Sequence, residues 1–260
     1  MASNTNWPEL LKEPGRCGHI AQLYQDVEFL TEAATDYIST GLRRGEAVLV
    51  IATPEHRATF AEVLQPGAAG QVKVLDAEET LARFMASGMP EWKSFHETVG
   101  GAIAELRLQY PSVRAYGEIV DVLWQKGQRE AALRVEEYLN ELTTLQTFCM
   151  LCAYHLDNLD SKAYGGPLES MCKVHTHLIP VRDYARFDRA VHEATTKVLD
   201  GPLAQILLSL SANHRPPTHM PSGQATLLWL RQNMPRTADR VLNELRTTSA
   251  CARDPAPRAA

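Results

Sequence analysis

The chain lacks any apolar run of the roughly 20 residues that a membrane-spanning helix requires. Its opening segment, MASNTNWPELLKEPGR, also lacks the apolar centre of a secretory signal peptide. The five cysteines are an odd number without the spacing of a disulfide framework, so we expect free thiols. Together these absences favour a cytoplasmic protein that does not contact a membrane.

A surplus of positive charge is absent as well. Lysine and arginine number 26 against 31 acidic residues in the 260-residue chain, and there is no dense basic run. A protein that mainly binds nucleic acid is usually basic, so we expect no direct nucleic-acid binding. Hydrophobic residues make up 45% of the chain, which is enough for a sizeable core.

Two catalytic signatures are missing. The segment ATPEHRATF, which follows the first fully apolar run, has neither the glycines nor the lysine of a phosphate-binding loop. The Gly-x-Ser-x-Gly motif of a hydrolase nucleophile does not occur either. We therefore predict that the chain is not an enzyme and has no catalytic residues. A weak anion site at the start of the next helix, beside His56 or Arg57, stays open.

The chain does contain a regular alternation of strands and helices. Strand patterns occur at 19–24, 47–52, 72–76, 113–116 and 148–154, with helical patterns between them. This alternation predicts an α/β fold with a mostly parallel sheet and helices on both faces. From about residue 167 onward only helical patterns follow, at 168–178, 187–199, 202–210 and 225–246.

We divide the chain into four parts. Residues 1–17 look like a flexible leader, and 18–180 form the α/β unit. Residues 181–250 are a helical extension for output or dimerisation, with an exposed linker at 214–217, and 251–260 are a disordered tail. An apolar stripe in the extension either covers the sheet or forms a dimer interface; it consists of Leu203, Ile206, Leu207 and Leu210.

Glu118 directly follows the strand at 113–116, and ligands of open α/β sheets bind outside the carboxyl ends of strands. We expect Glu118 to orient a ligand. Two alternatives remain: it pairs with a basic group such as Arg114, or it joins Asp76 and Asp121 in a magnesium site. The helix that ends near Leu142 is expected to turn one set of glutamates to solvent, namely Glu130, Glu136, Glu137 and Glu141.

Cysteine and histidine gather between residues 149 and 177, and both residue types are ligands for zinc and similar ions. Cys149 and Cys152 cannot hold the same ion, because residues three apart on a strand point to opposite faces. If a metal binds, its expected ligands are Cys152, Cys172, His175 and His19. We prefer the interpretation that these residues line the core or a pocket, and we expect no cofactor.

A further polar and aromatic set is explained equally well in two ways. It either lines a small-molecule pocket or belongs to an ordinary core with satisfied polar tips, and it consists of His19, Tyr24, Tyr116 and Tyr154.

Four segments, in the right order, resemble the MEDS domain, the sensory domain found in the dichloromethane regulator DcmR. They are GHIAQLYQDVEFL, GLRRGEAVLVIATPEHR, RAYGEIVDVLWQKGQREAALRVEEYLNEL, and FCMLCAYHLDNL with ESMCKVHTHLIP. The resemblance covers about residues 18–180, and the segment 114–142 is its most specific part. Two features depart from the family: His155 stands where proline is more usual, and 181–260 contain no recognisable helix-turn-helix or histidine-kinase-type module.

The resemblance implies a RecA/KaiC-like fold that has lost its phosphate loop and senses small hydrocarbon derivatives or related metabolites without catalysis. Together with the aromatic set, it gives the expected ligand-binding residues as His19, Tyr24, Thr53, Glu55, Tyr116, Glu118, Cys152 and His175.

We therefore predict a cytoplasmic, non-catalytic protein of signal transduction or transcription regulation. It would bind a small molecule at the strand carboxyl ends and signal through its C-terminal helices to a homodimer mate, a higher oligomer or a signalling partner. The alternatives are a metal- or haem-binding sensor or enzyme built on the cysteine and histidine residues, and an assembly scaffold without a ligand.

Overall fold

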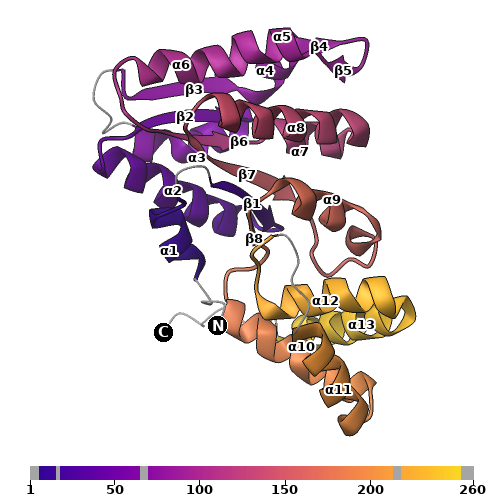
Figure 1. Ribbon diagram of the computed structural model, residues 1–260. Helices are drawn as coiled ribbons and strands as arrows, with labels where there is room; N and C mark the ends of the chain where they lie inside the picture. Colours follow the sequence, from indigo (N-terminus) through magenta and orange to yellow (C-terminus); the bar gives the residue numbers. More distant parts are fainter. Residues whose placement is uncertain (1–5, 16–17, 65–69, 213–217, 253–260) are drawn as a thin grey trace.

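A six-stranded parallel sheet, in the order β3-β2-β6-β7-β1-β8, is the centre of the molecule (Figure 1). The computed structural model describes residues 6–15, 18–64, 70–212 and 218–252. The strands are β1 His19–Tyr24, β2 Ala47–Ala52, β3 Val72–Asp76, β6 Val113–Gly117, β7 Cys149–His155 and β8 His177–Ile179. The predicted α/β fold is confirmed, and its layout is consistent with a RecA-like fold.

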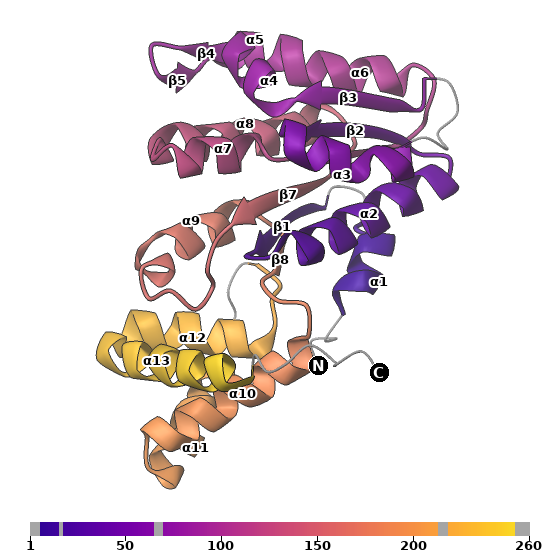
Figure 2. The ribbon, with the colours of Figure 1, turned by 180° about the vertical axis from the view of Figure 1, so that it is seen from behind.

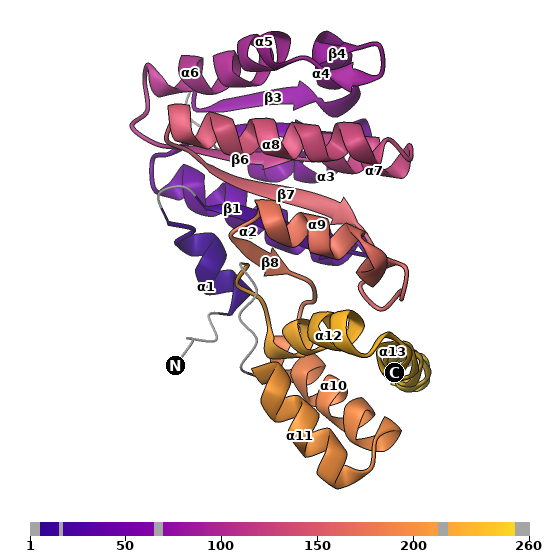
Figure 3. The same cartoon turned by 45° about the vertical axis from the view of Figure 1, so that its right-hand side comes forward.

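The two faces of the sheet carry two separate cores. Along β2, Leu49 and Ile51 pack into one core, whereas Val48 and Val50 pack into the other, because successive strand residues point to opposite faces. One face is covered by α2 Val27–Arg43 and α3 Pro54–Leu64, which lie before the strands in Figure 2. The other face is covered by α4 Ala77–Phe84, α6 Gly101–Arg107, α7 Ile119–Gln125, α8 Arg129–Leu145 and α9 Pro167–Val174 (Figure 3).

Local sequence explains where several of these helices begin and end. Asp26 accepts a hydrogen bond from the Phe29 backbone N–H at 2.7 Å, which caps α2 as its position predicts. The same helix stops before Gly45, whose φ of +73° favours glycine. Asp76 caps α4 in the same way, by accepting from the N–H groups of Glu78 and Glu79.

The C-terminal helices lie beyond the β8 edge of the sheet (Figures 1 and 3). They are α10 Tyr184–Val198, α11 Gly201–Ala212, α12 Ser222–Asn233 and α13 Pro235–Ala252. Helix α10 packs on both α12 and α13, and Pro235 separates the last two helices as its ring predicts. The predicted linker at 214–217 lies outside the described residues.

The prediction of a flexible leader is wrong for Trp7–Lys12. These residues form helix α1, which packs against α2 and buries Trp7, Leu10 and Leu11. A helix of only six residues is hard to predict from sequence when prolines and a glycine surround it. The predicted disordered tail is also wrong in part, because α13 continues to Ala252. Residues 1–5, 16–17 and 253–260 lie outside the described residues.

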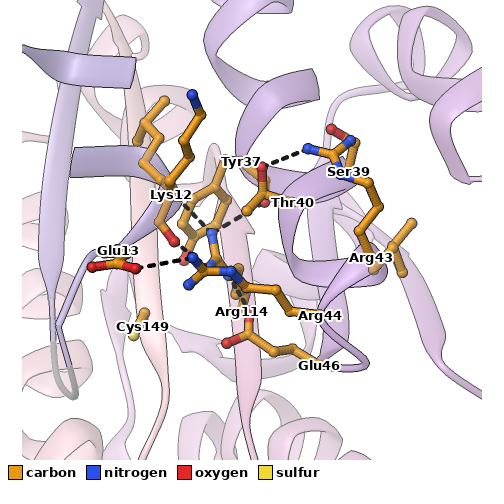
Figure 4. A network of polar contacts seen from close by, with 12 residues as sticks. Lys12, Glu13, Tyr37, Ser39, Thr40, Arg43, Arg44, Glu46, Arg114 and Cys149 are labelled. Atoms are coloured by element: carbon orange, nitrogen blue, oxygen red, sulfur yellow. Dashed lines mark hydrogen bonds and ion pairs between the residues drawn. The ribbon is translucent and has the colours of Figure 1, made fainter. Parts of the chain in front are cut away.

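Arg114 explains how α1 is held. Its guanidinium, 1% exposed, lies between α1 and α2 and forms an ion pair with Glu46 (Figure 4). It donates to the carbonyl oxygens of Leu11 and Lys12 at 2.6 and 2.9 Å and lies over the Tyr37 ring at 5.0 Å. The alternative that Arg114 pairs with Glu118 is therefore wrong, because the two side chains belong to opposite ends of β6.

The secondary structure predicted from sequence differs from the observed one in three places. Residues 177–179 form β8, although no strand was predicted after residue 167, because three residues are too few to show a period. The helix predicted at 77–87 ends at Phe84, and the hairpin of β4 Met85–Ala86 and β5 Met89–Pro90 follows it. The helix predicted at 91–109 consists of α5 Trp92–Phe95, a π-helical turn at 96–100 and α6. Among the described residues, no helix combines the length and apolarity needed to cross a membrane.

Candidate functional site

One group of polar side chains lies at the carboxyl ends of the strands, on the α3 side. This carboxyl-end cluster consists of Tyr24, His56, Tyr116, Glu118, Asp121 and His155. Glu118 is its centre, buried to 2% exposure. Its carboxylate accepts from the Thr53 N–H at 2.9 Å, from the Tyr116 hydroxyl at 2.7 Å and from His56 Nδ1 at 2.8 Å.

The Glu118 carboxylate occupies a backbone donor at the start of α3. Thr53 precedes α3, where the backbone N–H groups of a nucleotide-binding protein contact phosphate. Here a side-chain carboxylate of the protein takes the Thr53 N–H instead. This arrangement agrees with the absence of a phosphate loop from the sequence.

The electrostatics of the cluster follow from this carboxylate. The hydrogen bond to Glu118 raises the pKa of His56 above its usual value, despite the opposing effect of burial. Burial raises the pKa of Asp121, although its carboxylate accepts from Gln125 and from the His155 backbone N–H. Glu118, Glu55 and Asp121 all raise the pKa of His56, so the electrostatic field at this histidine is negative.

The rim of the cluster has polar groups available to a ligand. Within the described part of the chain, no hydrogen bond is formed by the Tyr24 hydroxyl or by the His155 ring, and their rings stand 5.3 Å apart. His155 is exposed. Asp121 lies beside them, bound to the His155 backbone at 3.0 Å. A small polar molecule at this rim would meet a hydroxyl, an imidazole and a carboxylate.

A second group is buried on the opposite face of the sheet, beneath α8. This buried four-residue cluster consists of His19 on β1, Glu136 on α8, Cys152 on β7 and His175 after α9. Ala21 pairs with Cys152 in the parallel register, so His19 and Cys152 are neighbours on one face of adjacent strands. The donor atoms of all four side chains lie within 4.8 Å of one another, and all four residues are buried.

Hydrogen bonds to the protein orient both imidazoles. His175 Nδ1 lies 2.9 Å from the Met171 carbonyl oxygen, which only accepts, so Nδ1 carries the proton. Asn140 Nδ2 donates to the Val174 carbonyl oxygen, which turns its Oδ1 toward His19 Nδ1 at 3.0 Å. In both rings, Nε2 is therefore the nitrogen that faces the cluster.

The charges of this cluster differ from residue to residue. Burial alone would raise the pKa of Glu136, but His175 and His19 lower it to about 2. Burial would lower the pKa of His19, but the Glu136 carboxylate outweighs that effect and raises it. Burial lowers the pKa of His175 to about 4 and raises that of Cys152. At neutral pH the carboxylate is therefore charged, while His175 and the thiol are neutral.

Within the described part of the chain, two buried atoms of the cluster have no hydrogen-bond partner, namely Glu136 Oε2 and His175 Nε2. Glu136 Oε2 forms an ion pair with His19 Nε2 at 3.2 Å, and His175 Nε2 lies 3.6 Å from Glu136 Oε1. The Tyr154 hydroxyl donates to that same Oε1. Unpartnered buried atoms are uncommon because each loses its hydration without compensation. Thiolate, imidazole and carboxylate are also the donors that zinc takes in proteins.

The expected ligand-binding residues separate into these two groups. Tyr24, Thr53, Tyr116 and Glu118 meet at the carboxyl ends, with the exposed Glu55 nearby. His19, Cys152 and His175 meet under α8. Neither Asp76 nor Cys172 joins a cluster: Asp76 caps α4 and pairs with Arg57, and Cys172 lies on α9.

Glu136 is the residue that sequence reasoning missed. It was predicted to face solvent, but it is 1% exposed. Its spacing from Ala132, Leu139 and Leu142 also fits the buried stripe, and the charge of the side chain concealed this signal. His56 was considered only for anion binding, whereas it binds Glu118.

Two clefts lie at the amino ends of the strands, away from both clusters. One, of about 580 Å³, is lined by α1 and Arg44; the other, of about 610 Å³, is lined by Glu46, Arg107 and Cys149, among others. Both include Gly15, which leads into residues 16–17 outside the described part of the chain. We therefore assign no site to them.

Comparison with known proteins supports one relationship. No curated protein matches the chain. The family model of the methanogen/methylotroph, DcmR sensory domain (MEDS) matches residues 18–176. All four residues of the buried cluster and all six of the carboxyl-end cluster fall within this match. Because it covers more than half of the 260 residues, the chain belongs to the MEDS family of sensory domains.

Proposed function

We propose that this protein is a non-catalytic sensor that binds a small uncharged or cationic molecule at the carboxyl-end cluster and signals through its C-terminal helices. One observation carries the proposal: the loop after β7 begins at the rim of that cluster and ends against those helices. The MEDS family match supports the sensory role. We place the protein in the cytoplasm, because the buried Cys152 and Cys172 are free thiols.

Charge selects the class of ligand. Glu118 and Asp121 lie side by side below the rim, and Glu55 adds a third carboxylate whose field reaches Tyr24. An anionic ligand would be repelled, and the backbone N–H that would receive it is already bound to Glu118. An alcohol, an amide or an amine has the donors that suit Asp121 and the Tyr24 hydroxyl.

The loop after β7 supplies the route to the C-terminal helices. Asp157, two residues beyond His155, forms an ion pair with Arg246 of α13 at 2.8 Å. Further along, the Tyr164 hydroxyl accepts from Gln224 of α12 at 2.8 Å, and both side chains are buried. A ligand that contacts His155 and prefers one position of this loop therefore shifts the population of helix arrangements.

The output surface in this proposal is α11, and its occupant is a second copy of the chain. Leu203, Ile206 and Leu210 are 45%, 57% and 51% exposed along one face of this helix, while Leu207 is buried. The helix sequence, GPLAQILLSLSA, contains no charged residue, so two copies would meet without repulsion. A different signalling protein at this face is the alternative outcome.

Thermal denaturation against a panel of small alcohols, amides and amines tests the ligand site. We expect at least one compound to raise the melting temperature of the wild-type protein but not of a Tyr24→Phe/Asp121→Asn variant. The matched control is Tyr138→Phe, whose hydroxyl contacts Pro90 away from the site. Equal stabilisation of all three proteins would contradict the site.

Hydrogen exchange and native mass spectrometry then test the output. With a compound found above, exchange should change in α12 and α13, and unchanged exchange there would contradict the signalling route. Leu203→Asp/Ile206→Asp should convert a dimer to a monomer. A wild-type monomer would contradict the α11 interface, and an assembly that no compound affects would favour a scaffold.

A further inference from the structure

We propose that His19, Glu136, Cys152 and His175 form a closed site for one divalent transition-metal ion, with zinc as the ion that fits the donors. The proposal rests on the buried four-residue cluster alone and does not depend on the sensory function or on the carboxyl-end cluster. It also departs from the ligand set expected from sequence, because Glu136 takes the place of Cys172.

The spacing of the donor atoms matches a tetrahedral shell. With Zn–N near 2.1 Å and Zn–S near 2.3 Å, neighbouring ligand atoms of such a shell stand about 3.3–3.6 Å apart. In the cluster, His19 Nε2 lies 3.3 Å from Cys152 Sγ and 3.2 Å from Glu136 Oε2, and His175 Nε2 lies 3.6 Å from Glu136 Oε1. The other donor atoms lie within 4.8 Å of one another, so a bound ion would draw these side chains closer together.

The surroundings of the cluster are those of metal ligands. Histidines that bind metals donate their other ring N–H to a carbonyl or carboxylate, which fixes the tautomer and the ring. His175 does so to Met171 O and His19 to Asn140 Oδ1. Both Nε2 atoms then face the same point. Tyr154 binds the Glu136 carboxylate and so supports a third ligand.

One nitrogen of the cluster still lacks a partner. Among the described residues, His175 Nε2 forms no hydrogen bond, and it lies 3.6 Å from the Glu136 carboxylate oxygen Oε1. A divalent cation between them gives both a partner. It also balances charge, because one thiolate and one carboxylate together carry two negative charges in a site that water does not reach.

A metal ion fits this site better than a haem. The His19 and His175 ring centroids are only 4.2 Å apart, and all four donors converge within 4.8 Å, which leaves no space for a macrocycle. Four protein ligands also fill a tetrahedral shell, which is the pattern of structural rather than catalytic zinc.

The site would connect the sheet to the C-terminal helices. Thr176 follows His175. Its hydroxyl accepts a hydrogen bond from the His19 backbone N–H and donates one to the His19 carbonyl oxygen. The hydroxyl of Thr218, just before α12, donates to the His175 carbonyl oxygen at 2.9 Å. A bound ion would therefore fix the segment to which α12 is attached.

Cobalt titration of the full-length, chelator-treated protein tests the proposal. Cobalt(II) takes the same tetrahedral geometry as zinc, and a bound thiolate adds a charge-transfer absorption. We expect one equivalent to bind with that absorption and one equivalent of zinc to displace it. Elemental analysis of protein purified without chelator should show metal at the same stoichiometry.

Variants identify the ligands. Cys152→Ser should abolish the thiolate absorption, and Glu136→Gln, which keeps the size of the side chain, should weaken binding by more than the roughly 10–100-fold of an outer-shell change. Cys172→Ser, a buried thiol outside the cluster, should bind cobalt like the wild type. Circular dichroism checks that each variant is folded; if Cys152→Ser does not fold, Glu136→Gln decides.

Three results would overturn the proposal. These are the absence of cobalt or zinc uptake by the folded wild-type protein, unchanged affinity in Glu136→Gln, and loss of the absorption in a folded Cys172→Ser variant. Because the carboxyl-end cluster lies on the other face of the sheet, each of these results would leave the proposed ligand site standing.

Discussion

Glu118 and Glu136 are both buried carboxylates, yet their environments differ. Glu118 accepts from a backbone N–H, a tyrosine hydroxyl and a histidine, so both of its oxygens have partners. Glu136 accepts from Tyr154, while among the described residues its Oε2 has only the ion pair with His19 and its Oε1 lies 3.6 Å from His175 Nε2. The two carboxylates are buried to a similar extent, but Glu118 accepts hydrogen bonds from more donors than Glu136 does.

The difference shows what each site can still do. A carboxylate whose acceptors are filled contributes to the fold and gains little from another partner. A carboxylate that faces further acceptors gains from a cation. In this chain, one glutamate therefore organises the carboxyl ends of the sheet, and the other is the one that we propose as an ion ligand.

The largest expected effect comes from removing Glu118. Glu118→Leu leaves three buried donors without an acceptor and should lower the free energy of unfolding by about 3–5 kcal/mol. In chelator-treated protein, Glu136→Leu removes the partner of the Tyr154 hydroxyl and of the His19 ring and should cost less, because two donors rather than three lose their acceptor. Urea denaturation measures both. Equal losses would remove the distinction between the two glutamates.

Zinc should increase the free-energy cost of losing Glu136. At a free zinc concentration 100 times the Kd, binding should raise the free energy of unfolding by about 2.7 kcal/mol. The wild type and Glu137→Gln, an exposed neighbour on α8, should both show the gain. Glu136→Gln should not. A gain of the same size in all three proteins would point to zinc binding elsewhere.

Asn140 should affect metal affinity without touching the ion. Asn140→Ala removes the acceptor that orients His19 and should weaken metal binding about 10–100-fold. Competition with a chromophoric chelator measures the change, with the exposed Glu141→Ala as control. Wild-type affinity in Asn140→Ala would show that His19 does not need this support.

The smallest expected effect is a pH dependence at His56. Glu118 raises the pKa of His56, and Glu55 and Asp121 contribute to the rise. The ion pair of His56 with Glu118 therefore stabilises the fold fully below pH 6.5 and loses this effect as the pH rises through the raised pKa. His56→Gln should therefore cost about 1 kcal/mol at pH 6 and less at pH 9. Urea midpoints at the two pH values check it, and a cost that grows with pH would contradict the sign.

Much of the fold was accessible from sequence because its signals are local. The all-apolar β2 identified a strand covered on both faces, and Asp26 and Gly45 set the ends of α2 through their own backbone chemistry. Short elements gave no such signal: β8 has three residues and α1 has six. The sequence suggested Arg114 as a partner for Glu118 because the two residues are close along the chain. It could not show that the Arg114 side chain lies at the amino end of β6, against Glu46 and Leu11.

The candidate sites were accessible only in part. The position of Glu118 after a strand predicted its place at the carboxyl ends of the strands, and the structure places it there, after β6. The cysteine and histidine residues were recognised as metal-ligand types, but their grouping depended on contacts between residues more than 100 positions apart, such as His19 and Cys152. Cys172 was wrongly grouped with them because it is close in sequence to His175.

The sequence by itself determined the alternation of strands and helices, the absence of a phosphate-loop motif at Thr53-Pro54 and membership of the MEDS family. These properties depend on backbone periods and on residue types at fixed spacing. Only the tertiary structure decided that Glu136 is buried and that it meets His19, Cys152 and His175. The physical reason is the strand order, because placing β1 beside β7 beneath α8 brings together four residues that no local period connects.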